Sequence, residues 1–336
     1  MTTAEHLPTT SARSASVGGP VLAPTSAVAA AAARSDELPL PTIDSVREAA
    51  KRIEPHIRRT PLLRITLDGR HAVLKLESLQ RTGAFKVRGA LNALLAHPGP
   101  GHVVTASGGN HGVAVATAAG QLGLPATVFV PRGAPEGKTR RISAAGARLV
   151  RHGETYAEAA EAAQRACADT HGRYVPAYDD ADVVAGQGTC PLEVVDDLPE
   201  VDAVVVPVGG GGLVAGTVLA AQGRTVVAVE PEGSACLHAS LQVGAPVDVE
   251  VDSVAASALG ATRIGQIPFA IAAPSVTSVL VTDDQLLAAR DLLWEEFRIA
   301  VEPAAATPVA AWLDRQVPGD LPALVLSGAN TDWRPL

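Results

Sequence analysis

The sequence lacks the features that mark several protein classes. It has three cysteines in 336 residues and no CxxC pair, which argues against a disulfide framework and a zinc site. It has no run of Lys or Arg and a formal net charge of −8, so the electrostatic footprint of a nucleic-acid binder is missing. No stretch approaches the roughly 20 apolar residues that a membrane-spanning helix needs. We therefore expect a cytoplasmic protein of two lobes whose partners are small molecules, not nucleic acids or membranes.

Residues 1–40 differ in composition from the rest of the chain. They are rich in Ala, Ser, Thr and Pro, contain no aromatic residue, and include five consecutive alanines at 29–33. They also lack a basic start followed by an apolar block of signal-peptide length. This composition predicts a disordered N-terminal tail.

From Pro41 onward, strand and helix patterns alternate, which indicates an α/β fold with mostly parallel sheets. The predicted strands cover 71–76, 102–105, 126–130, 147–150, 201–206, 225–229 and 323–326. The predicted helices cover 89–96, 112–122, 138–145, 155–170, 213–221 and 283–298.

A buried strand runs into four glycines and then a helix in the segment 201–215, VDAVVVPVGGGGLVA. Consecutive glycines let backbone N–H groups converge on an anion, and a helix N-terminus adds its positive dipole end. A tight strand-to-helix turn needs only one or two glycines. The pattern therefore favours a phosphate bound at Gly209, Gly210, Gly211 and Gly212.

A second glycine loop, TASGGNHG at 105–112, also follows a strand and opens a helix. Ser107, Asn110 and His111 add hydrogen-bonding side chains around Gly108 and Gly109. This loop is suited to a second anion, such as a substrate carboxylate, although a plain Gly/Asn-rich turn has the same composition.

Two nucleotide motifs are absent. The segment 133–139, GAPEGKT, has three residues between its glycines where a P-loop needs four, and Pro135 removes one N–H donor. No GxGxxG stands at a first strand-to-helix turn, so a nicotinamide enzyme has only the general architecture in its favour.

The segment 77–90, ESLQRTGAFKVRGA, resembles the cofactor-lysine motif of fold-type II pyridoxal phosphate (PLP) enzymes, in the threonine/serine dehydratase and serine racemase group. The resemblance extends over about residues 42–330. Five motifs follow the order of that family: TGAFKVRGA, SGGNHG, AGQGT at 185–189, VGGGGL, and LSGAN at 326–330.

The resemblance implies a fold and a cofactor. The fold is tryptophan synthase β-like, with two open α/β domains and PLP between them. The large domain comprises residues 41–95 and 175–336, and the small domain, which carries the carboxylate loop, comprises residues 100–172. The family also suggests a homodimer.

The resemblance also assigns roles to the motif residues. Lys86 forms the Schiff base with PLP, and Phe85 packs beside the cofactor ring. The phosphate is held by Gly209, Gly210, Gly211, Gly212 and Leu213. Asn110 faces the ring hydroxyl and Ser327 the pyridine nitrogen. The substrate carboxylate is clamped by Ser107, Gly108, Gly109, Asn110 and His111.

Ser327 and Gly108 narrow the range of reactions that we expect. A hydroxyl at Ser327 does not hold the pyridine nitrogen protonated as a carboxylate would, which favours expulsion of a β-hydroxyl group. In the racemases of this group a serine that reprotonates Cα stands where this chain has Gly108. We therefore expect a dehydratase that converts L-threonine or L-serine to a 2-oxo acid and ammonia, ahead of a serine racemase.

Other positions depart from the family pattern. Cys236 replaces an Asp that binds a divalent cation together with the equivalent of Glu230 in some members, so we expect no metal. Tyr178 stands where a Phe is typical, and Ser257 where an Asp is usual. These departures leave open β-elimination from 3-hydroxyaspartate, diaminopropionate or an activated serine, and a PLP-binding amino-acid sensor without turnover.

Overall fold

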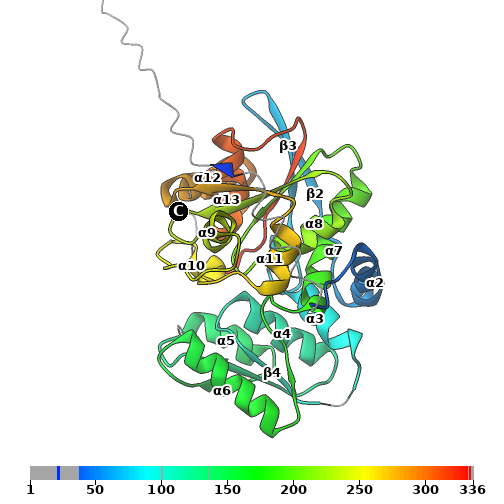
Figure 1. The fold of residues 1–336 in the computed structure, drawn as a ribbon, viewed down its shortest axis with the longest axis vertical. Helices are drawn as coiled ribbons and strands as arrows, with labels where there is room; N and C mark the ends of the chain where they lie inside the picture. Colours follow the sequence, from blue (N-terminus) through cyan, green and yellow to red (C-terminus); the bar gives the residue numbers. More distant parts are fainter. Residues whose placement is uncertain (1–20, 23–37, 100, 135, 332, 334–336) are drawn as a thin grey trace, which may run out of the picture.

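The computed structural model describes residues 21–22, 38–99, 101–134, 136–331 and 333. The α/β class predicted from the sequence is confirmed by two sheets flanked by helices (Figure 1). Most of the predicted tail, residues 1–20 and 23–37, lies outside the described residues. Within it, Val21–Leu22 form a short strand, β1, which the sequence did not predict and which pairs antiparallel with β10.

The larger sheet has seven strands in the order β1-β10-β9-β8-β11-β3-β2. Neighbours from β10 to β3 run parallel, and β2 forms an antiparallel pair with β3. The strand bounds are β2 Leu62–Leu67, β3 Arg70–Lys75, β8 Ala203–Pro207, β9 Thr225–Pro231, β10 Val276–Val281 and β11 Pro322–Val325.

Helices cover both faces of this sheet, so its central strands are apolar throughout. In β8, Val204 and Val206 pack with residues of α7 (Ala181–Asp197) and α8 (Gly212–Ala220). The intervening Val205 packs on the opposite face with α12 and α13. The remaining helices of this part are α2 Ile43–Ile53, α9 Cys236–Val243, α10 Ala256–Leu259, α11 Gln266–Ala272, α12 Asp283–Phe297 and α13 Pro303–Leu313, with 3-10 turns η2 Glu54–His56 and η3 Glu77–Leu79.

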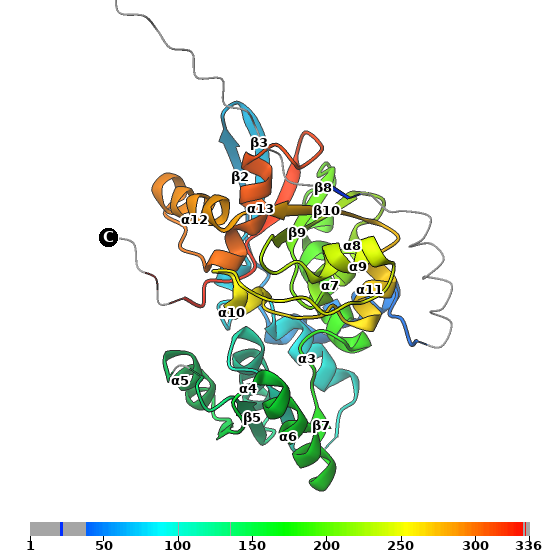
Figure 2. The ribbon, with the colours of Figure 1, turned by 60° about the vertical axis from the view of Figure 1, so that its left-hand side comes forward.

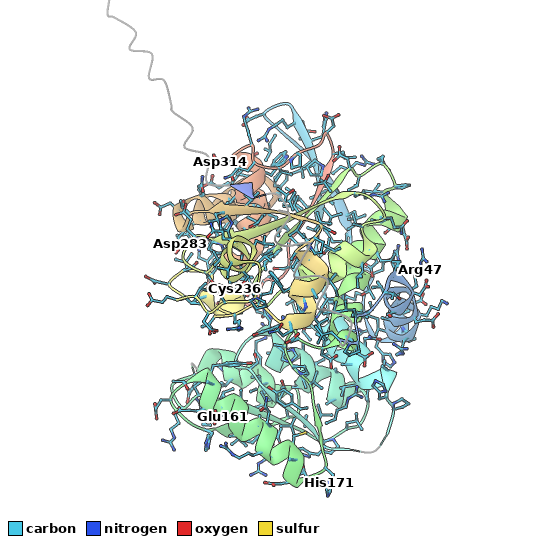
Figure 3. All side chains as sticks on the ribbon, viewed as in Figure 1. Arg47, Glu161, His171, Cys236, Asp283 and Asp314 are labelled. Carbon is cyan, nitrogen blue, oxygen red and sulfur yellow. The ribbon has the colours of Figure 1, made fainter. Side chains whose placement is uncertain are left out.

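The smaller sheet has four parallel strands in the order β6-β5-β4-β7. In Figures 1 and 2 it lies at the lower end of the molecule, where Glu161 and His171 are labelled in Figure 3. Along β5, Val128 and Val130 pack with α3 and α4, whereas Phe129 packs with α6. The bounds are β4 Val103–Ala106, β5 Ala126–Val130, β6 Arg148–Arg151, β7 Arg173–Tyr174, α3 Val87–Ala96, α4 Asn110–Gln121, α5 Glu136–Ala144 and α6 Tyr156–Asp169.

The AGQGT segment lies inside α7 and has a packing role. A Cβ atom on Gly186 would lie 2.6 Å from the Cα atom of Gly89 in α3. A Cβ atom on Gly216 of α8 would lie 2.5 Å from the backbone nitrogen of Gly188. These glycines let α3 and α8 approach the α7 backbone closely, which fixes the helix that begins directly after Lys86.

Candidate active site

Lys86 is the N-cap residue of α3, and a distant segment holds the backbone that leads into it. The N–H of Phe85 donates to the carbonyl oxygen of Ser327 at 3.1 Å, and the N–H of Ala329 donates to that of Gly83 at 2.8 Å. Gly83 has φ +74, the left-handed region that favours glycine. The TGAFK and LSGAN motifs therefore lie side by side in the fold.

The side chain of Lys86 is half-buried and points to neutral groups. Its Nζ donates to the carbonyl oxygen of Ala177 at 2.8 Å and lies 5.3 Å from the centroid of the Phe85 ring. Burial lowers the pKa of Lys86 to about 8. A substantial fraction of this amine is therefore unprotonated, and nucleophilic, at mildly alkaline pH.

One pocket surrounds Lys86, and every residue that the sequence assigned to cofactor binding lines it. Its lining residues are Phe85, Lys86, Asn110, Pro207, Gly209, Gly210, Gly211, Gly212, Leu213, Ala258, Leu259, Glu302 and Ser327. They come from segments before α3, before and within α8, and after β11, from α10, and from the starts of α4 and α13.

The four-glycine loop forms a close-packed turn at the start of α8. Gly211 is the N-cap residue and has φ +93. A Cβ atom on Gly210 would overlap the ring of Tyr178, and one on Gly209 would lie 3.0 Å from the Cα atom of Leu259. Gly210 and Gly211 have no room for a side chain unless their neighbours shift. The turn places the positive end of α8 at the pocket, where an anion is favoured.

The second glycine loop connects β4 to α4 and lines an adjoining pocket. The lining residues there are Gly108, Gly109, Asn110, Val113, Gly137, Arg141, Ser257, Glu302, Asn330 and Thr331. Asn110 and Glu302 line both pockets, which places the predicted carboxylate loop next to the predicted cofactor site.

Ser107 and His111 line neither of these two pockets. The Oγ of Ser107 accepts a hydrogen bond from the N–H of Gly109 at 3.2 Å, which shapes the loop. The Nε2 of His111 lies 3.0 Å from the carbonyl oxygen of Val175 and so carries the proton of that hydrogen bond. Burial and the nearby Lys86 lower the pKa of His111 to about 3, so its ring is neutral.

Glu302 was missed by the sequence reasoning, although it belongs to both pockets. It is buried at the N-cap of α13, and its Oε1 accepts a hydrogen bond from the Nδ2 of Asn110 at 2.7 Å. Asn330 donates from its Nδ2 to the Oδ1 of Asn110, also at 2.7 Å. The Glu-Pro pair at 302–303, a typical helix start, was the available signal.

The two positions named in the metal prediction, Glu230 and Cys236, both form hydrogen bonds within the protein. The carboxylate of Glu230 accepts hydrogen bonds from the N–H groups of Leu237 and His238, both at 2.8 Å, at the start of α9. Burial raises the pKa of Glu230 to about 8. The Sγ of Cys236 donates to the carbonyl oxygen of Gly209 at 3.3 Å, so this substitution contacts the glycine loop.

A buried charge cluster lies two residues beyond Lys86. Arg88 donates to both carboxylate oxygens of Glu77, at 2.8 and 2.7 Å, and to both of Glu193, at 2.8 and 3.0 Å. Lys75 donates to Glu193 at 2.5 Å. Two cations and two anions thus compensate one another in the interior and anchor the first turn of α3.

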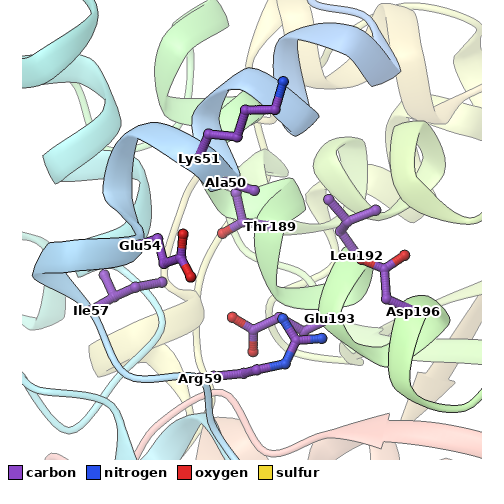
Figure 4. A pocket seen from close by; sticks show the side chains of 9 residues that line it. All are labelled: Ala50, Lys51, Glu54, Ile57, Arg59, Thr189, Leu192, Glu193 and Asp196. Atoms are coloured by element: carbon purple, nitrogen blue, oxygen red, sulfur yellow. The ribbon is translucent and has the colours of Figure 1, made fainter.

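A further pocket, drawn in Figure 4, lies between α2 and α7, away from Lys86. Charged side chains of both signs line it: Lys51, Glu54, Arg59, Glu193 and Asp196. Glu193 also belongs to the buried charge cluster, and Asp197 binds Arg59. None of the predicted site residues contributes to this pocket.

A comparison with protein families identifies the family of this chain. The family model described as "Pyridoxal-phosphate dependent enzyme" matches residues 53–328, a range that contains every residue predicted for the site. The chain belongs to this family. Its cofactor is accordingly PLP, as the motif resemblance predicted.

Several known proteins are similar over most of their length. The L-threonine ammonia-lyase of Thermotoga maritima is 36% identical over 305 residues, covering 87% of this chain and 76% of that protein. The L-threo-3-hydroxyaspartate ammonia-lyase of Saccharomyces cerevisiae is 35% identical over 310 residues, covering 88% of this chain and 95% of that protein. The crystal structure of the T.th. threonine deaminase, 36% identical, matches with a TM-score of 0.83 and covers 88% of this chain and 100% of that chain. The fold-type II prediction is confirmed.

The residues around the pocket suit PLP. The Gly209–Gly212 turn, in which a Cβ atom at Gly210 would overlap Tyr178, suits a compact anion such as the cofactor phosphate. The amine of Lys86, with its lowered pKa, suits attachment to an aldehyde. Ser327 is buried and neutral, which suits an unprotonated pyridine nitrogen.

Proposed function

We propose that this protein is a PLP-dependent ammonia-lyase that converts L-threonine or L-serine to a 2-oxo acid and ammonia. The observation that carries the proposal is that Lys86, the four-glycine loop and Ser327 line one pocket, and the predicted carboxylate loop adjoins it. The similarity to the Thermotoga maritima L-threonine ammonia-lyase and to the T.th. threonine deaminase supports the same reaction.

Different residues of this chain bind the phosphate, the ring and the substrate carboxylate. Gly209, Gly210, Gly211, Gly212 and Leu213 bind the phosphate through the start of α8, and Phe85 packs beside the ring. Asn110, oriented by Glu302 and Asn330, faces the ring hydroxyl, and Ser327 faces the ring nitrogen. The loop of Ser107, Gly108, Gly109, Asn110 and His111 holds the substrate carboxylate.

Lys86 both attaches the cofactor and moves the proton. When bound, PLP supplies an electron sink for the electron pair left on Cα. The freed amine of Lys86 removes the Cα proton, and its lowered pKa lets it accept that proton near neutral pH. The neutral hydroxyl of Ser327 favours departure of the β-hydroxyl group over long-lived carbanion chemistry. The water lost from Cα and Cβ is taken up again when the product is hydrolysed to the 2-oxo acid and ammonia, so no redox partner is needed.

A lyase is favoured over a racemase because of Gly108. Racemisation needs a second proton donor or acceptor on the opposite face of Cα. Gly108 has no side chain to supply one, and the neighbouring His111 is bound through Nε2 to Val175. An amino-acid sensor without turnover is excluded if L-threonine yields 2-oxobutanoate.

The assembly and location belong to the same proposal. We propose a homodimer in the cytoplasm, with a large domain of residues 41–95 and 175–336 and a small domain of residues 100–172. The two separate sheets support this division, and the free Cys167, Cys190 and Cys236 suit a reducing compartment. No helix in the described part of the chain is long and apolar enough to span a membrane. Light scattering coupled to gel filtration tests the dimer.

The proposed activity is tested by incubating the purified holoenzyme with L-threonine or L-serine and measuring 2-oxo acid and ammonia. Equal amounts of both products support the proposal. Racemised substrate without ammonia, or no change in either substrate, refutes it.

A further inference from the structure

Arg141 places a cation beside the predicted carboxylate loop. It belongs to α5 and lines the same pocket as Gly108 and Gly109 of the predicted carboxylate loop. Its Nη2 donates to the carbonyl oxygen of Thr82 at 3.2 Å, and its Nη1 donates to the Oδ1 of Asn330. These two contacts fix the guanidinium at the edge of the pocket.

The charge of Arg141 is not compensated by a carboxylate in the described part of the chain. Its hydrogen bonds to Asn330 and Thr82 both go to neutral oxygens, one of a side-chain amide and one of a peptide carbonyl. A guanidinium has five N–H donors, so three are left for a further acceptor. Its fork geometry suits a carboxylate better than any other small anion apart from phosphate.

The position of Arg141 relates it to the substrate and not to the cofactor phosphate. The phosphate loop lines the neighbouring pocket, and Arg141 is absent from that lining. Between the two lie Asn110 and Glu302, which line both pockets. A substrate whose first carboxylate binds at Gly108 and Gly109 would extend its side chain into a space lined by Arg141 and Ser257.

Among the described residues that line this pocket, Glu302 is the other charged group. Its Oε1 accepts the hydrogen bond from Asn110, and its backbone N–H donates to Gly328 at 3.2 Å. Glu302 lines the cofactor pocket as well, whereas Arg141 lines only this one and is the cation among its described lining residues.

We propose that Arg141 is a specificity-determining residue that binds the distal carboxylate of a dicarboxylic 3-hydroxy amino acid, with 3-hydroxyaspartate as the simplest case. This inference rests on the proposed ammonia-lyase function and widens its substrate class beyond threonine and serine. In the elimination the Cα–H and Cβ–O bonds break and water leaves. In the hydrolysis one water is taken up, the Cα–N bond is replaced by the Cα=O bond, and a 2-oxo dicarboxylic acid and ammonia result.

The kinetic test compares two substrates in the holoenzyme. The kcat/KM values for L-threo-3-hydroxyaspartate and for L-threonine are measured in the wild type, in Arg141→Ala and in Arg141→Lys. We expect the ratio of the dicarboxylic to the monocarboxylic value to fall about tenfold or more in Arg141→Ala, the size expected for the loss of a charged hydrogen-bonded pair. Arg141→Lys should recover part of the ratio because it keeps the charge without the fork.

Arg140→Ala is the matched control, since Arg140 precedes Arg141 on the same helix, is exposed as Arg141 is, and lines neither pocket. It should leave the ratio unchanged. An Arg141→Ala ratio equal to the wild-type ratio overturns the inference, as does a wild type that turns over threonine but not 3-hydroxyaspartate.

A binding measurement separates this inference from the proposed function. Calorimetric titration with L-malate, an unreactive four-carbon dicarboxylate, is compared with 2-hydroxybutyrate, which has a methyl group in place of the distal carboxylate. Arg141→Ala should weaken L-malate relative to 2-hydroxybutyrate by about tenfold or more, the loss expected for a charged hydrogen-bonded pair. If neither amino acid is turned over, the proposed function fails, and the titration alone still decides the role of Arg141. An unchanged preference for L-malate overturns it.

Discussion

The ring of Tyr178 lies so close to Gly210 that a Cβ atom at position 210 would overlap it. Gly210 is the second glycine of the predicted phosphate loop. Tyr178 stands one residue beyond Ala177, whose carbonyl oxygen accepts the hydrogen bond from Lys86. The tyrosine that replaces the typical phenylalanine thus forms a wall of the glycine loop. This contact explains why the loop needs a glycine at this position.

We predict that Gly210→Ala weakens PLP binding by about tenfold to 100-fold, because overpacking of about 1–3 kcal/mol must be relieved by moving the loop or the ring. Titration of the apoenzyme with PLP measures the change. Gly133→Ala is the control, since a Cβ atom there meets no atom within 4 Å. The double variant Gly210→Ala with Tyr178→Ala should regain part of the affinity. Wild-type affinity in Gly210→Ala would contradict this account of the loop.

The reactivity of Lys86 should depend on pH in a defined window. Burial lowers the pKa of its amine from 10.5 to about 8 in the folded protein. Only the unprotonated amine attacks an aldehyde, so the rate at which apoenzyme takes up PLP should rise with pH and level off above about 8. Stopped-flow absorbance follows the uptake, and N-acetyl-lysine over the same pH series corrects for titration of PLP itself. A rate that continues to rise toward pH 10.5, the ordinary pKa of a lysine, would contradict the lowered pKa.

Gly108 should control the balance between lyase and racemase chemistry. A Cβ atom at this position would lie 3.7 Å from Ala134 and 3.7 Å from Val130, which is ordinary contact, so Gly108→Ser fits without displacement. We expect this variant to gain conversion of L-serine to D-serine, measured by chiral chromatography, because it adds a proton donor beside the substrate. Gly108→Ala, with the same Cβ but no hydroxyl, should gain none. Efficient racemisation by the unmodified protein would refute the expectation that it is a lyase and not a racemase.

The buried charge cluster should matter far more for stability than the surface ion pairs. Glu193→Ala leaves Arg88 and Lys75 without their shared carboxylate, and we expect a loss of about 3–5 kcal/mol in the free energy of unfolding. Glu200→Ala, which removes an exposed pair with Arg64, should cost less than about 1 kcal/mol. Urea denaturation measures both. Similar losses in the two variants would show that the cluster does not anchor α3.

The site residues with local signals could be predicted from the sequence. Four glycines between a buried strand and a helix have few structural meanings, and the structure puts them at the N-terminus of α8 as expected. Lys86 was assigned by resemblance and lies in the same pocket as that loop. In both cases the signal lies within a few consecutive residues.

Contacts between distant segments could not be predicted in this way. Glu302 binds Asn110 across 192 positions of sequence, and nothing in either local segment indicates the pairing. The helix α7 was missed because Gly186, Gly188 and Pro191 disfavour a helix by propensity. The close packing of Gly186 against α3 and of Gly188 against α8 accompanies a helix that propensity alone does not indicate. Pro308 is likewise buried inside a helix, α13.

We propose that Lys86 attaches PLP and that the enzyme then converts a hydroxy amino acid to a 2-oxo acid. The most direct measurement is the absorbance spectrum of the purified protein before and after addition of L-threonine, coupled to an assay for 2-oxobutanoate. We predict a cofactor band that changes on addition of substrate as 2-oxobutanoate accumulates, and the loss of both in Lys86→Ala. A protein without a cofactor band after incubation with PLP, or a Lys86→Ala variant with wild-type turnover, would contradict the account.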